Sequence, residues 1–181
     1  MTTEIDWQRL ASEFGLLTAN RECSGSDYAR RALEQIVGED ALRRSVDYYV
    51  ARHPGSELAR SVLWQLRPWS AMSYCYEIFK GPNELPIRRK AVELLRVVAD
   101  RRALCWIKDF IDDSDPGIQT WGIGVLDQLL FAELIEPEEA EDLIKAAEAH
   151  QSEPVREVAG QIRIYLNERV EMEDRKNPEG S

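Results

Sequence analysis

The chain has 181 residues, of which 44% are hydrophobic and 31% are charged, a composition that is typical of a folded globular protein and excludes a disordered one. This length favours a single domain. The formal net charge of −10 argues against a partner that is itself a polyanion, such as a nucleic acid.

No run of about eighteen apolar residues occurs, and the first residues lack the basic and apolar blocks of a secretory signal, so we expect a cytoplasmic protein with no membrane partner. Cys23, Cys75 and Cys105 are an odd number of cysteines without CxxC spacing. They predict neither a disulfide framework nor a zinc site. We expect them to be buried thiols, and we expect no cofactor.

Amphipathic segments alternate with short breakers along the chain and predict five helical pairs. A single pair cannot bury its apolar side, whereas stacked pairs share one core, so we expect a single all-α domain over residues 1–170. Residues 171–181 are expected to form a charged, disordered tail. In chain order the predicted helices are 4–19 with 26–37, 39–52 with 55–67, 69–80 with 84–99, 101–112 with 115–131, and 137–150 with 153–170.

One phrase recurs in the second helix of each pair. It reads YARRALEQI, LARSVLWQL, IRRKAVELL, IQTWGIGVL and VREVAGQIR, at spacings of 30, 29, 31 and 37 residues. Each copy has an apolar residue followed four places later by a small or slim one, and positions four apart lie on one side of a helix. The pattern predicts close helix packing at Ala32, Val62, Ala91, Gly122 and Ala159. Each copy also follows an acceptor or a proline, which suits the first helical turn.

Three copies carry a family resemblance. Pro86-Ile87-Arg88 before Ala91, Asp115-Pro116 before Ile118, and Pro154-Val155-Arg156 before Ala159 resemble the Asp-Pro-x-Val-Arg-x-x-Ala signature of HEAT repeats. The resemblance covers residues 4–170 and is weaker in the first two copies, while the period is closer to short HEAT-like repeats. It implies a right-handed α-α superhelix, a solenoid of the armadillo type, of about five hairpins. It also implies that Arg88 and Arg156 join neighbouring repeats and that the second helices line a concave face.

The 100° helical step identifies the positions of those helices that point away from the core. If residues 87, 91, 94, 95 and 98 point inward, then 89, 93 and 96 point outward, and the same register applies to the other copies. We expect the arginines to form a row that binds a partner, or else to pair with acids nearby on their own helices. The candidate binding residues are Arg30, Arg60, Trp64, Arg67, Arg89, Glu93, Arg96, Asp127 and Glu157.

Among these residues Trp64 can supply a large contact area, although a half-buried packing role is the alternative. Trp7, Trp69, Trp106 and Trp121 are expected in the core or between repeats.

Signs of catalysis are missing from the sequence. His53 and His150 lie beside helix ends without an acid or nucleophile at a suitable spacing, so we expect surface or capping roles. Gly122 and Gly124 form a GxG within a helical pattern, with no preceding strand and no third glycine, so they favour helix packing over a dinucleotide loop. The sequence indicates no enzyme and no metal site.

The function that these features favour is noncatalytic binding of another protein by a monomeric scaffold. The charge is uneven, since residues 21–110 carry 16 Lys or Arg against 12 Asp or Glu, and residues 111–181 carry 6 against 18. The acidic end either aids solubility or forms a second contact surface. A cytoplasmic inhibitor, such as an immunity protein that covers a basic toxin domain, would fit this charge.

Two alternatives come from resemblance to other HEAT-like proteins. DNA glycosylases of this kind use basic and aromatic side chains with one acid, for which the candidates are Arg30, Arg60, Trp64, Arg89, Arg96 and Asp127. The net charge opposes nucleic-acid binding. Auxiliary proteins of the bilin lyase type also have short HEAT-like repeats, but the sequence offers no residue distinctive of a tetrapyrrole site.

Overall fold

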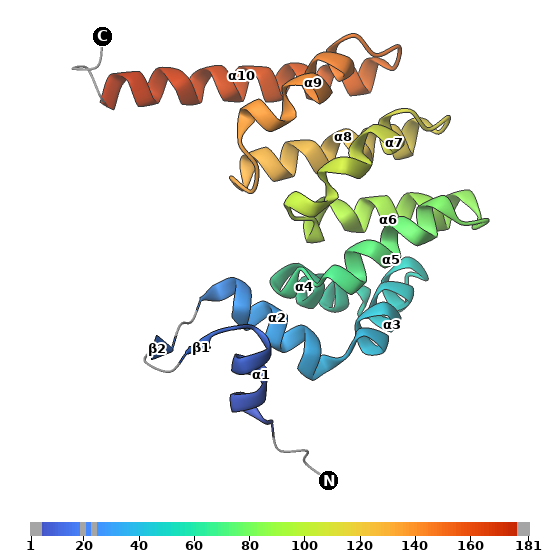
Figure 1. Cartoon of the computed structure of the whole chain (residues 1–181). Helices are drawn as coiled ribbons and strands as arrows, with labels where there is room; N and C mark the ends of the chain where they lie inside the picture. The colour runs from blue at the N-terminus through green and yellow to red at the C-terminus, as the bar shows by residue number, and fades with distance from the viewer. Residues whose placement is uncertain (1–4, 19–20, 23–24, 177–181) are drawn as a thin grey trace. The chain divides into compact units, whose positions relative to one another are not determined.

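The computed structural model describes residues 5–18, 21–22 and 25–176, and they are almost entirely helical (Figure 1). The chain divides into two compact units, residues 1–74 and 75–181, at a point within helix α5 (Trp69–Lys80). The sequence predicts one repeat domain over 1–170. Because the division falls inside a helix, the two units are described separately.

The first unit contains α1 (Trp7–Glu13), α2 (Ser26–Val37), α3 (Glu39–Val50), α4 (Ser56–Leu66) and the first part of α5. A short antiparallel ladder joins β1 (Leu17–Thr18) to β2 (Arg21–Glu22). Helix α3 packs against α4, and α2 contacts both. Asp6 caps α1, where its carboxylate accepts a hydrogen bond of 2.9 Å from the Arg9 amide.

The second unit contains the rest of α5 and then α6 (Leu85–Val98), the 3₁₀ helix η1 (Arg101–Trp106), α7 (Ile107–Ile111), α8 (Pro116–Phe131), α9 (Pro137–Glu148) and α10 (Glu153–Lys176). Helix α8 packs between α6 and α10, as the green, yellow and red ribbons in Figure 1 show. Helices α7 and α9 contact each other and α8. The α7–α8 and α9–α10 hairpins therefore pack side by side.

Local signals explain where these helices begin. Proline stands in the first turn of α6, α8 and α9, where a missing amide hydrogen leaves no bond unmade. Asp115 caps α8 and accepts a 2.9 Å hydrogen bond from the Ile118 amide. The predicted second helices begin within one or two residues of the observed ones, at residues 26, 56, 85, 116 and 153. The predicted starts of the second helices are thus confirmed.

Three boundaries differ from the prediction. The first helix ends at Glu13 and not at residue 19, because Gly15 takes a left-handed φ of +68° and the short ladder follows. Residues 101–106 form a 3₁₀ helix. Helix α10 continues to Lys176, so the predicted tail at 171 begins inside a helix, and residues 177–181 lie outside the described residues.

The predicted packing register holds in the second unit and fails in α4, and in α2, which contains Ala32, no residue is buried. Ala91 and Ala159 are fully buried, and an added Cβ at Gly122 would lie 2.3 Å from the Cβ of Phe110, so α7 and α8 meet closely. In α4, however, Val62 is exposed and Leu58 is 73% exposed, whereas Leu63 is fully buried. By helical spacing, either Val62 or Leu63 could lie on the buried side of α4. Packing against the neighbouring helices places Leu63 in the core.

Several single residues also differ from expectation. Trp7 and Trp69 are exposed and not in the core. Cys75 is buried, whereas Cys105 is exposed and Cys23 lies outside the described residues. Trp7 lies on α1, where Leu10 is the one buried residue.

Candidate functional site

The solvent-facing sides of α6, α8 and α10 form one surface of the second unit, which we call the α6–α8–α10 face. It contains five of the predicted binding residues, none of which is fully buried. These residues are Arg89, Glu93 and Arg96 on α6, Asp127 on α8, and Glu157 on α10.

Arg89 is held by Asp115 at the beginning of α8. Its Nε and Nη2 donate to the two carboxylate oxygens at 2.7 and 2.5 Å. This hydrogen bonding from Arg89 keeps the pKa of Asp115 below its ordinary value, and it raises the pKa of Arg89. Glu93 is likewise paired, with the Lys90 ammonium at 2.7 Å. The sequence predicts Arg89 as a binding residue. In the structure its hydrogen bonds to Asp115, the cap of α8, join α6 to α8.

Arg96 differs from these neighbours because it has no acidic partner. It forms no ion pair and no hydrogen bond with any residue that the structure describes, and its buried Nε is unsatisfied. Its guanidinium carbon lies 5.8 Å from the centre of the Trp121 ring. Its Cδ runs along α8 at Gly124, where an added Cβ would lie 3.4 Å away. Arg96 thus presents a half-buried positive charge between α6 and α8.

Asp127 lies one helical turn beyond Gly124 on the same side of α8. It is half-buried, and no carboxylate hydrogen bond to it is present among the described residues. Desolvation raises its pKa above the ordinary value, and the nearby charge of Arg96 opposes that rise. Residues 121, 124 and 127 follow a three-residue spacing, which makes each a neighbour of the next on the helix surface. Arg96 lies near all three residues.

The face also carries exposed apolar side chains. Ile164 of α10 is 61% exposed, and Phe131 at the end of α8 is 67% exposed. The Phe131 ring lies 6.0 Å from the Tyr165 ring of α10. Glu157 is exposed. Apolar side chains with a charged group among them are a composition that protein interfaces share.

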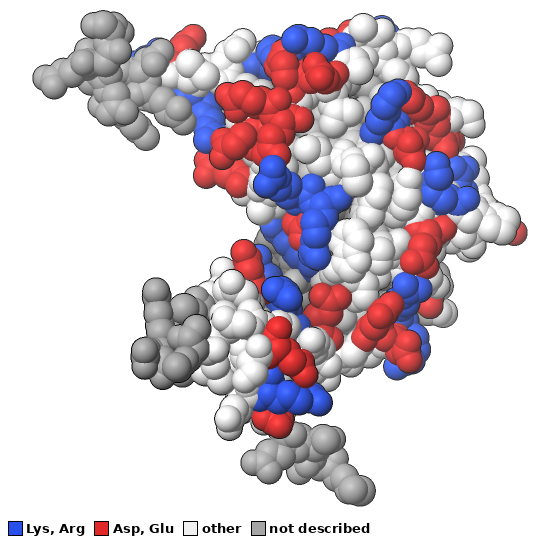
Figure 2. Space-filling model, viewed as in Figure 1, with Lys and Arg blue, Asp and Glu red and all other residues white. Residues whose placement is uncertain are grey.

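Acidic side chains border this surface. Six of the ten residues from 133 to 142 are acidic, and red surface gathers around the beginning of α9 (Figure 2). Some of these acids are paired, such as Glu139 with Arg101 at 2.5 Å and Glu141 with Arg163 at 2.9 Å. Others, including Glu136 and Glu138, are exposed.

The other predicted binding residues belong to the first unit. Arg30 pairs with Asp27 at 3.6 Å, and Arg60 pairs with Glu57 at 3.1 Å, each three residues away on its own helix. Arg67 ends α4 with a left-handed φ of +44°. Trp64 is exposed. Arg30 and Arg60 are therefore paired with acids nearby on their own helices, which is the alternative that the sequence leaves open.

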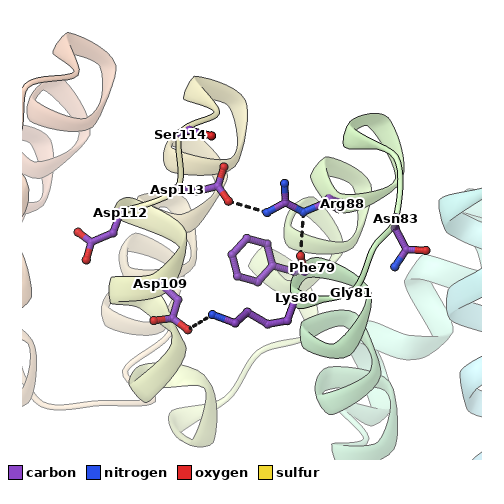
Figure 3. Close-up of a pocket in the computed structure, with 9 residues that line it drawn as sticks. All are labelled: Phe79, Lys80, Gly81, Asn83, Arg88, Asp109, Asp112, Asp113 and Ser114. Carbon is purple, nitrogen blue, oxygen red and sulfur yellow. Dashed lines mark hydrogen bonds and ion pairs between the residues drawn. The ribbon is translucent and has the colours of Figure 1, made fainter.

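A cavity of about 530 Å³ lies between the α5–α6 turn and the α7–α8 turn (Figure 3). Arg88 crosses it, donating to the Phe79 carbonyl at 2.8 Å and to Asp113 at 2.6 Å. Lys80 pairs with Asp109 at 3.0 Å. Because these charged groups bind each other across the cavity, they link the α5–α6 turn to the α7–α8 turn. This is the role that the HEAT resemblance implies for Arg88.

Arg156 does not have the linking contacts of Arg88. Its Nη1 donates to the carbonyls of His150 and Gln151, at 2.7 and 2.8 Å, and so closes the α9–α10 turn. His150 itself accepts a 3.1 Å hydrogen bond from the Ser152 amide, which is the capping role expected for it. His53 is exposed beside the Tyr48 ring.

Comparison with known proteins gives no relative. No family model, curated protein or solved structure matches this chain. Among residues 5–18, 21–22 and 25–176, no group of three or more His, Cys, Asp or Glu side chains is placed to hold a metal ion. None of the described helices has the length and apolarity that crossing a membrane requires.

The sequence predicts Trp121 in the core or between repeats, and the residue is half-buried against Arg96, between the third and fourth helical pairs. Its place beside a candidate binding residue and one structural contact are not predicted. Its spacing of three from Gly124 is the signal that could have placed it there. Glu34 caps α5, where its carboxylate accepts from the Ser70 amide at 2.9 Å and the Ser70 hydroxyl at 2.7 Å. No local signal indicates that contact.

Proposed function

We propose that this protein is a noncatalytic protein-binding module and that the α6–α8–α10 face contacts its partner. The observation that carries the proposal is Arg96, a half-buried guanidinium without an acidic partner among the described residues. It stands in a surface with exposed Ile164 and Phe131. Protein interfaces combine arginine with aromatic or aliphatic side chains in this way, because such groups contribute most binding free energy when a partner excludes water from them.

The proposal includes the arrangement of the repeats. We infer that the helical pairs continue as a right-handed HEAT-like superhelix, with the second helices of the pairs on its inner side. The packing of α8 between α6 and α10 and the bridging bonds of Arg88 support this inference. A rigid array of this kind presents a binding surface at small entropic cost.

The acidic surface favours a partner with positive charge. The net charge is −10, and the side chains around the beginning of α9 are predominantly acidic. Opposite charges on two proteins speed their encounter and disfavour other partners. A cytoplasmic inhibitor or immunity protein that covers a basic partner is the form of the function that this charge supports best.

A DNA glycosylase is the second candidate, and Asp127 is the observation that favours it. A half-buried carboxyl with a raised pKa, beside an arginine and a tryptophan, is the kind of group that acid–base chemistry uses. The net charge of −10 opposes binding to phosphates. Titration with fluorescent duplex DNA at low salt distinguishes the two functions, since the protein-binding module should show no saturable binding.

Photocrosslinking tests the protein-binding proposal. A benzophenone amino acid is placed at Ile164 on the face or, as a control, at Lys145, which is exposed on the α9 helix. Each full-length variant is irradiated in an extract of the cells that make the protein. We expect one discrete protein adduct from position 164 and none from position 145. No adduct from position 164, or the same adducts from both positions, would refute the proposal.

A further inference from the structure

We infer that Arg96 is the receptor for one carboxylate group of the protein partner, either an Asp or Glu side chain or the chain terminus. This inference rests on the proposed function and identifies the chemistry that the same face recognises. It assigns Arg96 as the specificity residue, with Trp121 and Gly124 as the groups that position it.

The first step of the argument is the unsatisfied charge. A buried polar group without a hydrogen bond is costly, and a guanidinium has five N–H donors and no acceptor. Other arginines of the second unit have carboxylate partners, among them Arg88, Arg89, Arg101, Arg102 and Arg163. Arg96 has none among the described residues, and its Nε is buried. The Nη groups of this half-buried side chain are not covered in this way, and they are the donors that an anion from outside can reach.

The second step concerns orientation. The Arg96 side chain lies against the glycine backbone of α8 at Gly124, with 3.4 Å between the position of an added Cβ and Cδ. Its guanidinium lies 5.8 Å from the centre of the Trp121 ring. A planar guanidinium that is fixed in this way loses little freedom when it binds, and its paired N–H groups match the two oxygens of a carboxylate.

The third step selects a carboxylate over a phosphate. Asp127 lies close enough to Arg96 to interact with its charge, and the protein carries a net charge of −10. A phosphate dianion would meet more repulsion here than a group of single negative charge. Arg89 cannot assist with a second positive charge, because Asp115 already binds it with two hydrogen bonds. Arg96 is therefore suited to an anion of the partner that carries a single negative charge.

NMR spectroscopy of the arginine Nε–Hε groups tests the inference on the full-length protein. The Arg96 signal is assigned with an Arg96→Lys variant, and the Arg89 signal serves as an internal control. The probe is N-acetylglutamate α-amide, which has one carboxylate, and N-acetylglutamine α-amide is its neutral match. Inorganic phosphate is titrated separately.

We expect the glutamate probe to shift the Arg96 signal saturably while the Arg89 signal stays in place, and we expect the glutamine probe to produce no saturable shift. Equal shifts with both probes, or tighter binding of phosphate than of the glutamate probe, would overturn the inference. The two proposals fail separately. Absence of a crosslinked protein at Ile164 counts against the protein-binding function, whereas an unresponsive Arg96 signal in a protein that does crosslink counts only against the carboxylate.

Discussion

Gly122→Ala is the substitution that tests the helix packing of the second unit most sharply. The new Cβ would lie 2.3 Å from the Cβ of Phe110 and 3.4 Å from two of its backbone atoms. Phe110 is fully buried, so none of these three atoms can move without shifting α7. Carbon atoms pack best about 3.5 to 4.0 Å apart, so the two helices would have to separate by roughly 1 Å.

The magnitude follows from two opposing effects. Overpacking of a core costs about 1 to 3 kcal/mol, and a contact with backbone lies near the upper end of that range. Replacing glycine with alanine inside a helix contributes about 1 kcal/mol in the other direction. We therefore expect Gly122→Ala to lower the free energy of unfolding by about 2 kcal/mol, measured by urea denaturation with far-ultraviolet circular dichroism.

Two other helical glycines provide matched controls. An added Cβ at Gly160 meets no atom within 4 Å, and at Gly124 it meets only the flexible side chain of Arg96 at 3.4 Å. Gly160→Ala and Gly124→Ala should each raise the free energy of unfolding by about 0.5 to 1 kcal/mol. If Gly122→Ala proves as stable as Gly160→Ala, the close α7–α8 contact described above does not exist.

Three further predictions concern carboxylates. Glu34→Ala removes the cap that binds Ser70, so it should cost about 1 to 2 kcal/mol in urea denaturation, and Glu34→Gln should recover part of the loss; an unchanged Glu34→Ala protein would contradict the cap. The lowered pKa of Asp115 stabilises the fold above the ordinary Asp pKa of about 3.9, and that stability is lost as the pH falls through the lower folded-state pKa. Asp115→Asn should therefore reduce the melting temperature at neutral pH and approach the wild type in acid. The effect of Asp127 has the opposite sign, because its raised pKa makes the ionised form unfavourable in the folded protein above about pH 3.9. Asp127→Asn should therefore raise the free energy of unfolding at neutral pH, by less than about 1 kcal/mol, and lose this advantage in acid. Equal pH profiles for the two variants would refute both assignments.

The helices are predictable from the sequence because their signals are local. Asp115-Pro116 marks the beginning of α8 through a cap and a proline that act within one turn. The four-residue spacing of Ile87 and Ala91 likewise identifies the side of α6 that packs, although Ile87 itself remains partly exposed. Gly15, in contrast, ends α1 early by its left-handed backbone, and the helical pattern continues past it.

Contacts between distant residues are where sequence reasoning stops. The LARSVLWQL copy offers two adjacent apolar sides, one with Val62 and the other with Leu63, and only the neighbouring helices decide between them. Arg89 and Asp115 are 26 residues apart, so helical spacing could not reveal their pairing. The same limit applies to Arg96, whose outward position was predictable but whose lack of an acidic partner depends on how α6 meets α8.

Isothermal titration calorimetry of the crosslinked partner with the Arg96→Gln and Lys145→Gln variants tests whether Arg96 binds that partner. Both variants remove one positive charge, and Lys145 lies on α9 outside the face. A hydrogen-bonded charge pair contributes about 1.5 to 3 kcal/mol, so Arg96→Gln should weaken binding by at least about tenfold. Lys145→Gln should stay within about twofold of the wild type. Equal affinities for the two variants would contradict the account.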